Sequence, residues 1–274
     1  DVDAALATAA RTVTAEYRAP WLAHAALEPV NCTVRAGRDR AEVWVSTQVP
    51  DLARAAVARV LALPDEAVTV HVLWLGGGFG RRLEVDFIAQ AAAIARAVPD
   101  TPVQTVWSRE QDTQHDLYRP ACVARFTAGL DAQNRLVAWK NTSAGQAILP
   151  QVLDRVFGLP GGGPDKTASE GAFDQPYAWP AARIGHVNVD LPLPVGFWRA
   201  VGHSHQAFFK EGFLDEVAHA AGTDPLALRE ALLADQPRAL AVLRAAAQAA
   251  GWGRPSAPAP DGAPTALGLA LHRS

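Results

Sequence analysis

The sequence of 274 residues contains no methionine and no long apolar run. A membrane-spanning helix needs about 18–20 consecutive apolar residues, so none is expected here. The acidic start Asp1-Val-Asp3 leads into an alanine-rich segment without the pattern of a signal peptide. Because even an initiator methionine is missing, we expect the chain to be an internal piece of a longer protein, to be processed, or to have modified methionines that the sequence omits.

Cysteine is almost as scarce, and the histidines are not arranged as metal ligands. Cys32 and Cys122 stand far apart in the sequence. A disulfide framework or an iron–sulfur site needs more cysteines at close spacing, so two buried thiols are the simpler interpretation. The eight histidines include no HExxH or HxxxH arrangement, and His203 with His205 alone would be too few to hold a metal ion.

Neither sign of charge dominates. The 25 Lys and Arg residues nearly balance the 28 Asp and Glu residues, which gives a net charge of -3 and a pI near 6.3. A general nucleic-acid-binding protein concentrates basic charge on one surface, so we expect no nucleic-acid partner. With 49% hydrophobic and 19% charged residues, the composition is typical of a globular protein with enough apolar material for a core.

Apolar periodicity predicts an α/β (α+β) fold with mixed sheets and helices. Apolar and polar residues alternate in the expected strands, and apolar residues recur at helical spacing in the expected helices. The expected strands cover residues 12–17, 41–46, 68–75, 103–107, 121–130, 135–145 and 184–191. The expected helices cover residues 2–10, 83–97, 204–221 and 237–250, with two more that begin at Pro50 and Pro225.

The predicted elements divide the chain into four segments. Residues 1–145 form an α/β segment, and residues 146–180 form a long irregular loop marked by glycine and scattered proline. Residues 181–253 hold a second glycine-bounded loop followed by helices. Residues 254–274 are a linker and the start of a further strand, at 266–272. Loops as long as 146–180 are usually functional or wrap another part of an assembly.

A glycine-rich loop is the strongest local feature. The strand at 68–75 runs into Gly76-Gly-Gly-Phe-Gly80, and a helix follows. Glycines let the backbone turn tightly and approach a ligand, and the N–H groups at a helix start attract anions. Arg81 and Arg82 add positive charge, so an oxyanion or phosphate ligand would suit the loop. A dinucleotide-binding GxGxxG motif would need glycine where Arg81 stands, and a tight turn without a ligand is the remaining alternative.

Three other motifs also lie at the ends of predicted strands and helices. His24-Ala-Ala-Leu-Glu-Pro29 precedes a strand, Val45-Ser-Thr-Gln-Val-Pro50 ends one, and Gly196-Phe-Trp-Arg-Ala-Val-Gly-His-Ser-His205 precedes a helix. In α/β proteins, donors at strand ends commonly bind ligands. We interpret His24 and Glu28 as a buried pair that positions the first strand rather than as catalytic groups.

The order of the motifs HAxxEP, STQxP, GGGFGRR, WRxVGxSH and EGFLDEVAHAAGTDP resembles the xanthine dehydrogenase and aldehyde oxidase family. The double arginine after GGGFG, together with WRxVGxSH, is most similar to the large (beta) subunit of the isoquinoline oxidoreductase branch. The resemblance extends over nearly the whole chain and is weakest at 146–180. It implies an internal fragment of a molybdenum hydroxylase large subunit that forms one molybdopterin-binding lobe.

The resemblance also implies roles for individual residues. In the family, the glutamine of STQ bonds near an oxygen ligand of molybdenum, and the glycine loop and the WRxVG arginine amide surround the cofactor. The implied cofactor-binding residues are Gln48, Gly77, Gly78, Phe79, Gly80 and Arg199, and none of them binds the metal directly. Leu83 and Val201 stand where purine-hydroxylating relatives have an acidic residue and a phenylalanine. The implied substrate pocket therefore favours an apolar N-heterocycle or an aldehyde over xanthine.

The reaction and the partners follow from the same resemblance. It implies an oxidoreductase that hydroxylates an N-heteroaromatic compound, or oxidises an aldehyde, with oxygen from water. The implied cofactor is molybdenum–molybdopterin, with the cytosine dinucleotide form as one option. The implied partners are a small subunit with [2Fe–2S] clusters, the remainder of the large subunit and a small-molecule substrate. The implied location is the bacterial cytoplasm or the periplasmic face of the inner membrane.

Two features of the family are missing from residues 206–274. The family's catalytic base is a glutamate in a glycine-flanked GE motif, and an E-x-GQG segment binds the other side of the pterin. We therefore expect no catalytic residue in this chain and no activity of the chain alone. A non-catalytic assembly or docking module built on the same lobe is the alternative function. A nucleotide-binding α/β protein would require the glycine loop to bind phosphate in isolation.

Overall fold

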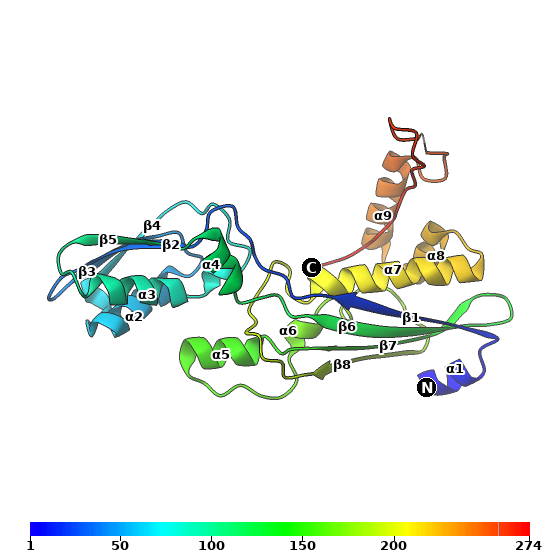
Figure 1. The fold of residues 1–274 in the computed structure, drawn as a ribbon. Coiled ribbons are helices and arrows are strands. Elements are labelled where there is room, and N and C mark those ends of the chain that lie inside the picture. Colours follow the sequence, from blue (N-terminus) through cyan, green and yellow to red (C-terminus); the bar gives the residue numbers. More distant parts are fainter. Residues whose placement is uncertain (257) are drawn as a thin grey trace.

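The computed structural model describes residues 1–256 and 258–274. In this part of the chain, two four-stranded sheets lie toward opposite ends of an elongated molecule (Figure 1). One sheet, in the order β4-β3-β2-β5, consists of β2 (Asn31–Ala36), β3 (Ala41–Val45), β4 (Val68–Val72) and β5 (Pro102–Val106). The other, in the order β1-β6-β7-β8, consists of β1 (Arg11–Ala19), β6 (Cys122–Leu130), β7 (Leu136–Gly145) and β8 (Ala182–Asn188).

Each sheet is mixed, as the sequence predicts. The pairs β3–β4 and β7–β8 are parallel, and the other neighbours are antiparallel. Ala19 at the end of β1 lies opposite Cys122 at the start of β6. Residues 20–121 therefore leave the second sheet and return to it between two adjacent strands. We call residues 20–121 the first module, and the β1-β6-β7-β8 sheet with its helices the second module.

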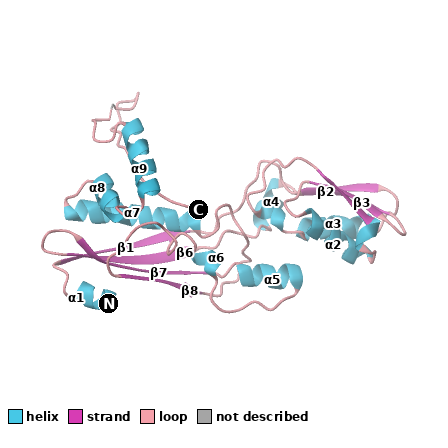
Figure 2. Ribbon diagram, turned by 180° about the vertical axis from the view of Figure 1, so that it is seen from behind, coloured by secondary structure: helices cyan, strands magenta, loops and turns pink. Residues whose placement is uncertain are grey.

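The first module packs its helices on one face of its sheet. α2 (Pro50–Leu61) and α3 (Asp86–Ala95) lie side by side against that face (Figures 1 and 2). Alternate residues of β2 are buried, and Val34 packs in one core with Val57 of α2 and Ile88 of α3. Burying a side chain of this size stabilises a fold by about 1.5–3 kcal/mol. The short elements of this module are η1 (Asp65–Ala67), η2 (Arg81–Leu83) and α4 (Arg109–Gln114).

The second module packs one long helix along its sheet. Phe126 and Trp139 of the sheet contact Phe213 of α7 (His203–Ala221), with ring centroids 5.1 Å apart in both pairs. The helices predicted after it are confirmed as α8 (Pro225–Leu232) and α9 (Pro237–Ala250). Asp224 caps α8 by accepting a hydrogen bond from Leu226 N at 2.8 Å. At the other end of the chain, α1 (Val2–Ala7) packs against β7.

The segment 146–180 is more regular than predicted. It contains α5 (Leu149–Phe157) and α6 (Lys166–Ser169). Pro150 lies in the first turn of α5, where its missing N–H costs nothing, and Gly158 ends the helix in a left-handed conformation. The prediction of an irregular loop is therefore wrong for these stretches, because proline and glycine mark helix ends as well as loops.

Two further predictions differ from the structure. The helix expected at 83–97 begins only at Asp86, because η2 occupies the residues after the glycine loop. No strand forms at 266–272 within the described residues. Leu269 and Leu271 instead pack against the core of the second module, and Leu271 N donates to Glu211 Oε2 at 2.9 Å. The segment 266–272 is therefore held by the burial of these side chains rather than by pairing with a strand.

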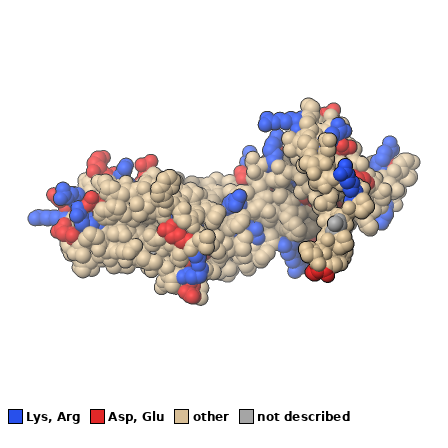
Figure 3. All heavy atoms as spheres, turned by 90° about the horizontal axis from the view of Figure 1, so that it is seen from above, with Lys and Arg blue, Asp and Glu red and all other residues tan. Residues whose placement is uncertain are grey.

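Three general properties of the described residues bear on the sequence-based expectations. Cys32 and Cys122 are both buried free thiols, as predicted. Among these residues, no helix combines the length and the apolar character that crossing a bilayer demands. On the face shown in Figure 3, acidic and basic side chains are interspersed, and wide stretches of uncharged surface separate them.

Candidate functional site

The loop that follows β4 contains an unusual run of backbone conformations. Gly77 and Gly80 have φ angles of 111° and 104°, which glycine tolerates far better than other residues. Phe79 has a φ angle of 54° although it carries a side chain, and such strain persists only where the surroundings impose it. The N–H groups of Gly78 and Phe79 have no hydrogen-bond partner in the described part of the chain. Two backbone donors are therefore free to bind a ligand.

Gln48 lies directly against this loop. Its side-chain Oε1 accepts a hydrogen bond from Gly80 N at 3.1 Å, and its own backbone N donates to Arg82 O at 3.0 Å. A Cβ added to Gly78 would lie only 2.7 Å from Gln48 Oε1. The structure thus brings together the STQ and GGGFG motifs, whose residues are about thirty positions apart in the sequence. With Oε1 bonded to the loop, the exposed Gln48 side chain retains its amide NH₂ group as a donor.

The two arginines after the loop point inward, which contradicts their predicted role as ligand-facing charges. Arg81 is 1% exposed and donates from both terminal nitrogens to Asp86, at 2.8 Å each. Arg82 is fully buried and donates to Gly77 O at 2.9 Å and to Glu28 Oε2 at 2.8 Å. A buried guanidinium that donates hydrogen bonds to several acceptors holds the surrounding backbone in place. Sequence alone gives no side-chain direction in an irregular loop.

Glu28 and His24 are structural, as predicted, but they do not pair with each other. Glu28 accepts hydrogen bonds from Arg82 and from Gly76 N, the latter at 2.9 Å. Desolvation raises the pKa of Glu28, but hydrogen bonds from Asn31 and Gly76 and the charge of Arg82 outweigh it and hold the pKa below its usual value. His24 binds Asp116 instead, with Nδ1 2.9 Å from Asp116 Oδ1. The prediction of a His24–Glu28 pair is wrong because the partner lies far along the chain.

Residues 196–202 carry the WRAVG sequence and are called the WRAVG loop. This loop contacts the glycine loop, residues 76–80, through Phe197. A Cβ on Gly80 would lie 1.8 Å from Phe197 O, so the two backbones are in direct contact. Arg199 follows two residues later and is exposed. Ala200 and Val201 have φ angles of 65° and 47°, and a β-branched residue in this region is a clear outlier. The two predicted cofactor loops therefore meet, and strained residues lie in both of them.

The two residues assigned to the substrate pocket lie near these loops. Leu83 ends η2 and is half-buried, and Val201 is half-buried in the strained turn. Their role in a pocket stays a prediction. Glu84, next to Leu83, is 4% exposed and accepts a hydrogen bond from Arg155 Nε at 3.0 Å. Its carboxylate is therefore committed to an ion pair that links the first module to α5.

Sequence reasoning missed Asp116 and Arg155 in this region. Asp116 receives hydrogen bonds from His24 N and Leu117 N, at 2.6 and 2.7 Å, and its side chain is 2% exposed. Neither residue belongs to a motif, and their side-chain partners His24 and Glu84 are many tens of positions away. A buried acidic residue shows no periodic pattern that would reveal its partner.

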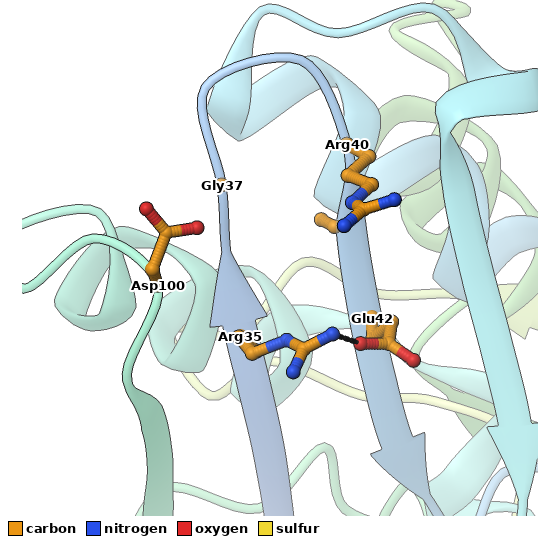
Figure 4. Close-up of a pocket in the computed structure, with 6 residues that line it drawn as sticks. Arg35, Gly37, Arg40, Glu42 and Asp100 are labelled. Carbon is orange, nitrogen blue, oxygen red and sulfur yellow. Dashed lines mark hydrogen bonds and ion pairs between the residues drawn. The ribbon is translucent and has the colours of Figure 1, made fainter.

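A separate cavity of about 140 Å³ lies at the other end of the first module's sheet (Figure 4). It is lined by Arg35, Gly37, Arg40, Ala41, Glu42 and Asp100. Arg35 donates to Glu42 across the β2–β3 pair, so these two charges in the cavity are paired with each other. Because β3 begins at this cavity and ends beside Gln48, the cavity is distinct from the glycine-loop site.

The donors at the loops fit an oxygen-rich organic anion. Backbone N–H groups and an uncharged amide can bind phosphate or pterin oxygens without a counter-charge of their own. Gln48 and Phe197 occupy the positions where Cβ atoms of Gly78 and Gly80 would lie, so glycine at both positions lets these residues pack against the loop. These features suit the molybdopterin group that the sequence resemblance implies.

Comparison with known proteins identifies the family. Residues 1–233 match the molybdopterin cofactor-binding domain. The chain is 32% identical over 262 residues to isoquinoline 1-oxidoreductase subunit beta from Brevundimonas diminuta, covering 93% of this chain and 32% of the relative. It is 29% identical over 231 residues to the aldehyde oxidoreductase molybdenum-binding subunit PaoC of Escherichia coli strain K12, covering 84% of this chain and 30% of the relative. It thus spans about a third of these relatives' length.

A solved structure gives the same result for the fold. Quinoline 2-oxidoreductase from Pseudomonas putida 86 superposes with a TM-score of 0.73 over 92% of this chain and 34% of that chain, at 18% identity. Likeness at this level of identity concerns the fold, and the family match carries the assignment. The resemblance first indicated by the motifs is confirmed. The chain belongs to the molybdopterin cofactor-binding domain family of molybdenum hydroxylase large subunits.

Proposed function

We propose that this chain forms one wall of the molybdopterin site in an enzyme that hydroxylates an N-heteroaromatic compound or oxidises an aldehyde. The observation that carries the proposal is the contact between the glycine loop, Gln48 and the WRAVG loop. Gly78 N and Phe79 N are free donors, Gln48 keeps its amide NH₂ group, and the Arg199 loop begins at the same point. The similar isoquinoline and aldehyde oxidoreductases support this class of substrate.

The chain's own residues would bind and orient the group rather than react. Gly78 N and Phe79 N would donate to cofactor oxygens, and the Gln48 amide would donate beside them. The Arg199 backbone amide would contribute from the second loop. When bound, the molybdenum–molybdopterin group supplies the two-electron redox chemistry. Preorganised donors of this kind need no rearrangement during the reaction because the loop geometry is already fixed.

The general base of the reaction would lie in another part of the complete subunit. Glu84 is an acidic side chain next to the proposed pocket, but its carboxylate is held in an ion pair by Arg155 and so is not free to contact a substrate. We therefore propose that the remainder of the large subunit supplies the base, as the family pattern implies. A small subunit with [2Fe–2S] clusters would accept the electrons, and the cofactor would be the cytosine dinucleotide form. We place the enzyme in the bacterial cytoplasm or at the periplasmic face of the inner membrane.

Apolar side chains at the proposed pocket suggest the kind of substrate. Leu83 and Val201 offer no charge and no hydrogen-bond donor to a purine. The proposed substrate is therefore an apolar N-heterocycle or an aldehyde rather than xanthine. Steady-state assays of the complete enzyme with quinoline, benzaldehyde and xanthine would decide this, and a kcat/KM that is highest for xanthine would contradict it.

The cofactor assignment is tested with glycine variants of the complete enzyme. In Gly78→Val, the new side chain would displace Gln48 Oε1, so we expect molybdenum and pterin contents to fall severalfold. Phe79→Ala should cause a smaller loss because the proposed contact is made by the backbone. Gly162→Val is the matched control, since nothing lies within 4 Å of a Cβ at Gly162. Equal cofactor content in Gly78→Val and the control would contradict the assignment. A wild-type enzyme that retains cofactor but oxidises neither substrate class would favour the assembly module.

A further inference from the structure

His24 lies between an anion and a carbonyl oxygen, both buried. Its Nδ1 is 2.9 and 3.1 Å from the two carboxylate oxygens of Asp116. Its Nε2 is 2.9 Å from Phe197 O, on the opposite side of the ring. The side chains of His24 and Asp116 are each 2% exposed. Water therefore has little access to either ring nitrogen.

The chemistry of the two acceptors fixes the number of protons on the ring. A carbonyl oxygen can only accept, so Nε2 must donate to Phe197 O. An ionised carboxylate can only accept as well, so Nδ1 must donate to Asp116. A neutral imidazole has one N–H and would direct a lone pair at one of these oxygens. Only the doubly protonated ring satisfies both contacts.

The groups around the pair keep Asp116 ionised. Burial raises the pKa of Asp116, but hydrogen bonds from His24, the charge of His24 and the Leu117 N–H outweigh it and lower the pKa. Arg81 Nε lies 3.2 Å from Asp116 Oδ1 and adds a second positive charge. Two other carboxylates belong to this network: Asp86 pairs with Arg81 at 2.8 Å, and Asp112 pairs with Arg109 at 3.1 Å. Each carboxylate in this network therefore has a positively charged partner.

The position of His24 connects this charge to the two cofactor loops. Phe197 O, which His24 holds, occupies the space where a Cβ on Gly80 would lie. A Cβ on Gly80 would also come within 3.3 Å of His24 Nε2. We propose that His24 is a buried imidazolium that locks the WRAVG loop against the glycine loop, as a positioning residue for the cofactor site. The cofactor part of this inference rests on the proposed function, whereas the charge and the lock do not.

The protonation state is measured on the 274-residue chain by ¹⁵N NMR with labelled histidine. A His24→Gln variant assigns the His24 resonances among the eight histidines. We expect both His24 nitrogens to carry protons at pH 7. In Asp116→Asn, the amide can donate to Nδ1, so we expect His24 to become a neutral ring with its proton on Nε2. A neutral His24 in the wild-type chain overturns the inference.

The lock is measured by trypsin cleavage after Arg199, which is exposed in the WRAVG loop. Loss of a hydrogen bond to a charged group should raise the cleavage rate of His24→Gln roughly tenfold, because the loop opens more often. Asp116→Asn should cleave at close to the wild-type rate because it keeps the bond to Phe197 O. His115→Gln, an exposed neighbouring histidine, is the control. Equal rates in His24→Gln and the control overturn the lock.

The link to the cofactor is measured in the complete enzyme. We expect His24→Gln to hold severalfold less molybdenum than His115→Gln at equal protein concentration. If the wild type binds cofactor and both variants bind it equally, the positioning role is wrong and the proposed function stands. If the wild type binds no cofactor, the proposed function and the positioning role both fail. The NMR and cleavage results then still test whether His24 is doubly protonated and whether it holds the WRAVG loop against the glycine loop.

Discussion

Four residues with side chains adopt positive φ angles around the two loops: Ala25, Phe79, Ala200 and Val201. A left-handed conformation costs an ordinary residue roughly 1–2 kcal/mol, so a folded chain holds it only where neighbouring contacts impose it. Here the imposing contacts are the glycine loop's fit against Gln48 and Phe197. Phe79 is one of the residues that the sequence resemblance assigns to the cofactor, and the other three strained residues lie in or beside the two loops.

The tightest position is Gly80, and its replacement is the most informative stability test at this scale. Gly80→Ala would place a Cβ 1.8 Å from Phe197 O, on a backbone with φ of 104°. We expect a loss of about 3 kcal/mol or more in the free energy of unfolding, because two backbone segments must separate. Urea denaturation measures this loss. Gly162→Ala should cost less than about 0.5 kcal/mol, and a similar value for Gly80→Ala would show that the loops are not in firm contact.

At the residue scale, the sequence predicted spatial neighbours correctly only where two motifs stand at the spacing seen in the family. The STQ and GGGFG motifs suggested that Gln48 lies near Gly78, and the structure brings them together. The inward direction of Arg81 and Arg82 was missed because loop residues have no periodicity from which to infer a face. The His24–Asp116 contact was missed because it depends on how residues 108–121 fold back across the module.

At the scale of elements, α7 is notable for polar groups on its buried surface. His205, Gln206, Lys210 and Glu211 are buried along the same helix as Phe209. Burial, followed by the charges of Arg119 and His186, lowers the pKa of His205 to about 4. Its Nε2 has no hydrogen-bond partner within the described residues. The helix therefore needs a neutral ring at this position.

Acid should destabilise the fold through this ring. Its pKa is about 4 when folded and near 6.5 when unfolded, so between these values the unfolded chain binds more protons. The stabilisation is complete above pH 6.5 and is lost as the pH falls through 4, with a full size of about 3 kcal/mol. Urea denaturation at pH 7 and pH 4.5 should show a smaller acid loss for His205→Gln than for wild type. His219→Gln, exposed on the same helix, should behave as wild type; if both variants lose stability equally, the explanation is wrong.

Elements were predicted well wherever apolar periodicity was strong. Every strand of the two sheets except β2, for which no range was predicted, lies close to its expected position, as do the helices α2, α8 and α9. The short helix α4, which depends on a capping box at Ser108 and Gln111, was not predicted. α5 was missed because a single amphipathic stretch between glycine- and proline-rich flanks resembles a loop in composition.

At the scale of the whole molecule, the two modules are joined by loops, by hydrogen bonds such as His24 Nε2 to Phe197 O, and by one ion pair among the described residues. Arg155 of α5 and Glu84 beside η2 form this pair. Arg155→Ala would leave Glu84 buried without its cation and should cost about 2 kcal/mol, less than for a fully buried pair because 27% of the Arg155 side chain is exposed. In the double variant with Glu84→Gln, part of this loss should return. Strictly additive losses by urea denaturation would exclude a direct pair.

The isolated 274-residue chain should fold but should not retain molybdopterin tightly. Each module has its own apolar core, whereas the loops described here provide donors on one wall only. A site assembled from several segments loses most of its affinity when one of them is absent. Elemental analysis of the purified chain, with dye-reduction assays using quinoline and benzaldehyde, tests this. Stoichiometric molybdenum with turnover would place the complete site within these residues.

The pairing of Ala19 with Cys122 also has a consequence for synthesis on the ribosome. The first module is made entirely between two neighbouring strands, so β1 leaves the ribosome long before β6 exists. At about 5–20 residues per second, β1 waits roughly 6–20 seconds for its partner. During that interval its edge is unpaired, and such an edge can pair with other chains. The first module can fold in the same interval, and its folding would bring the ends of residues 20–121 together and place β6 beside β1 as it emerges.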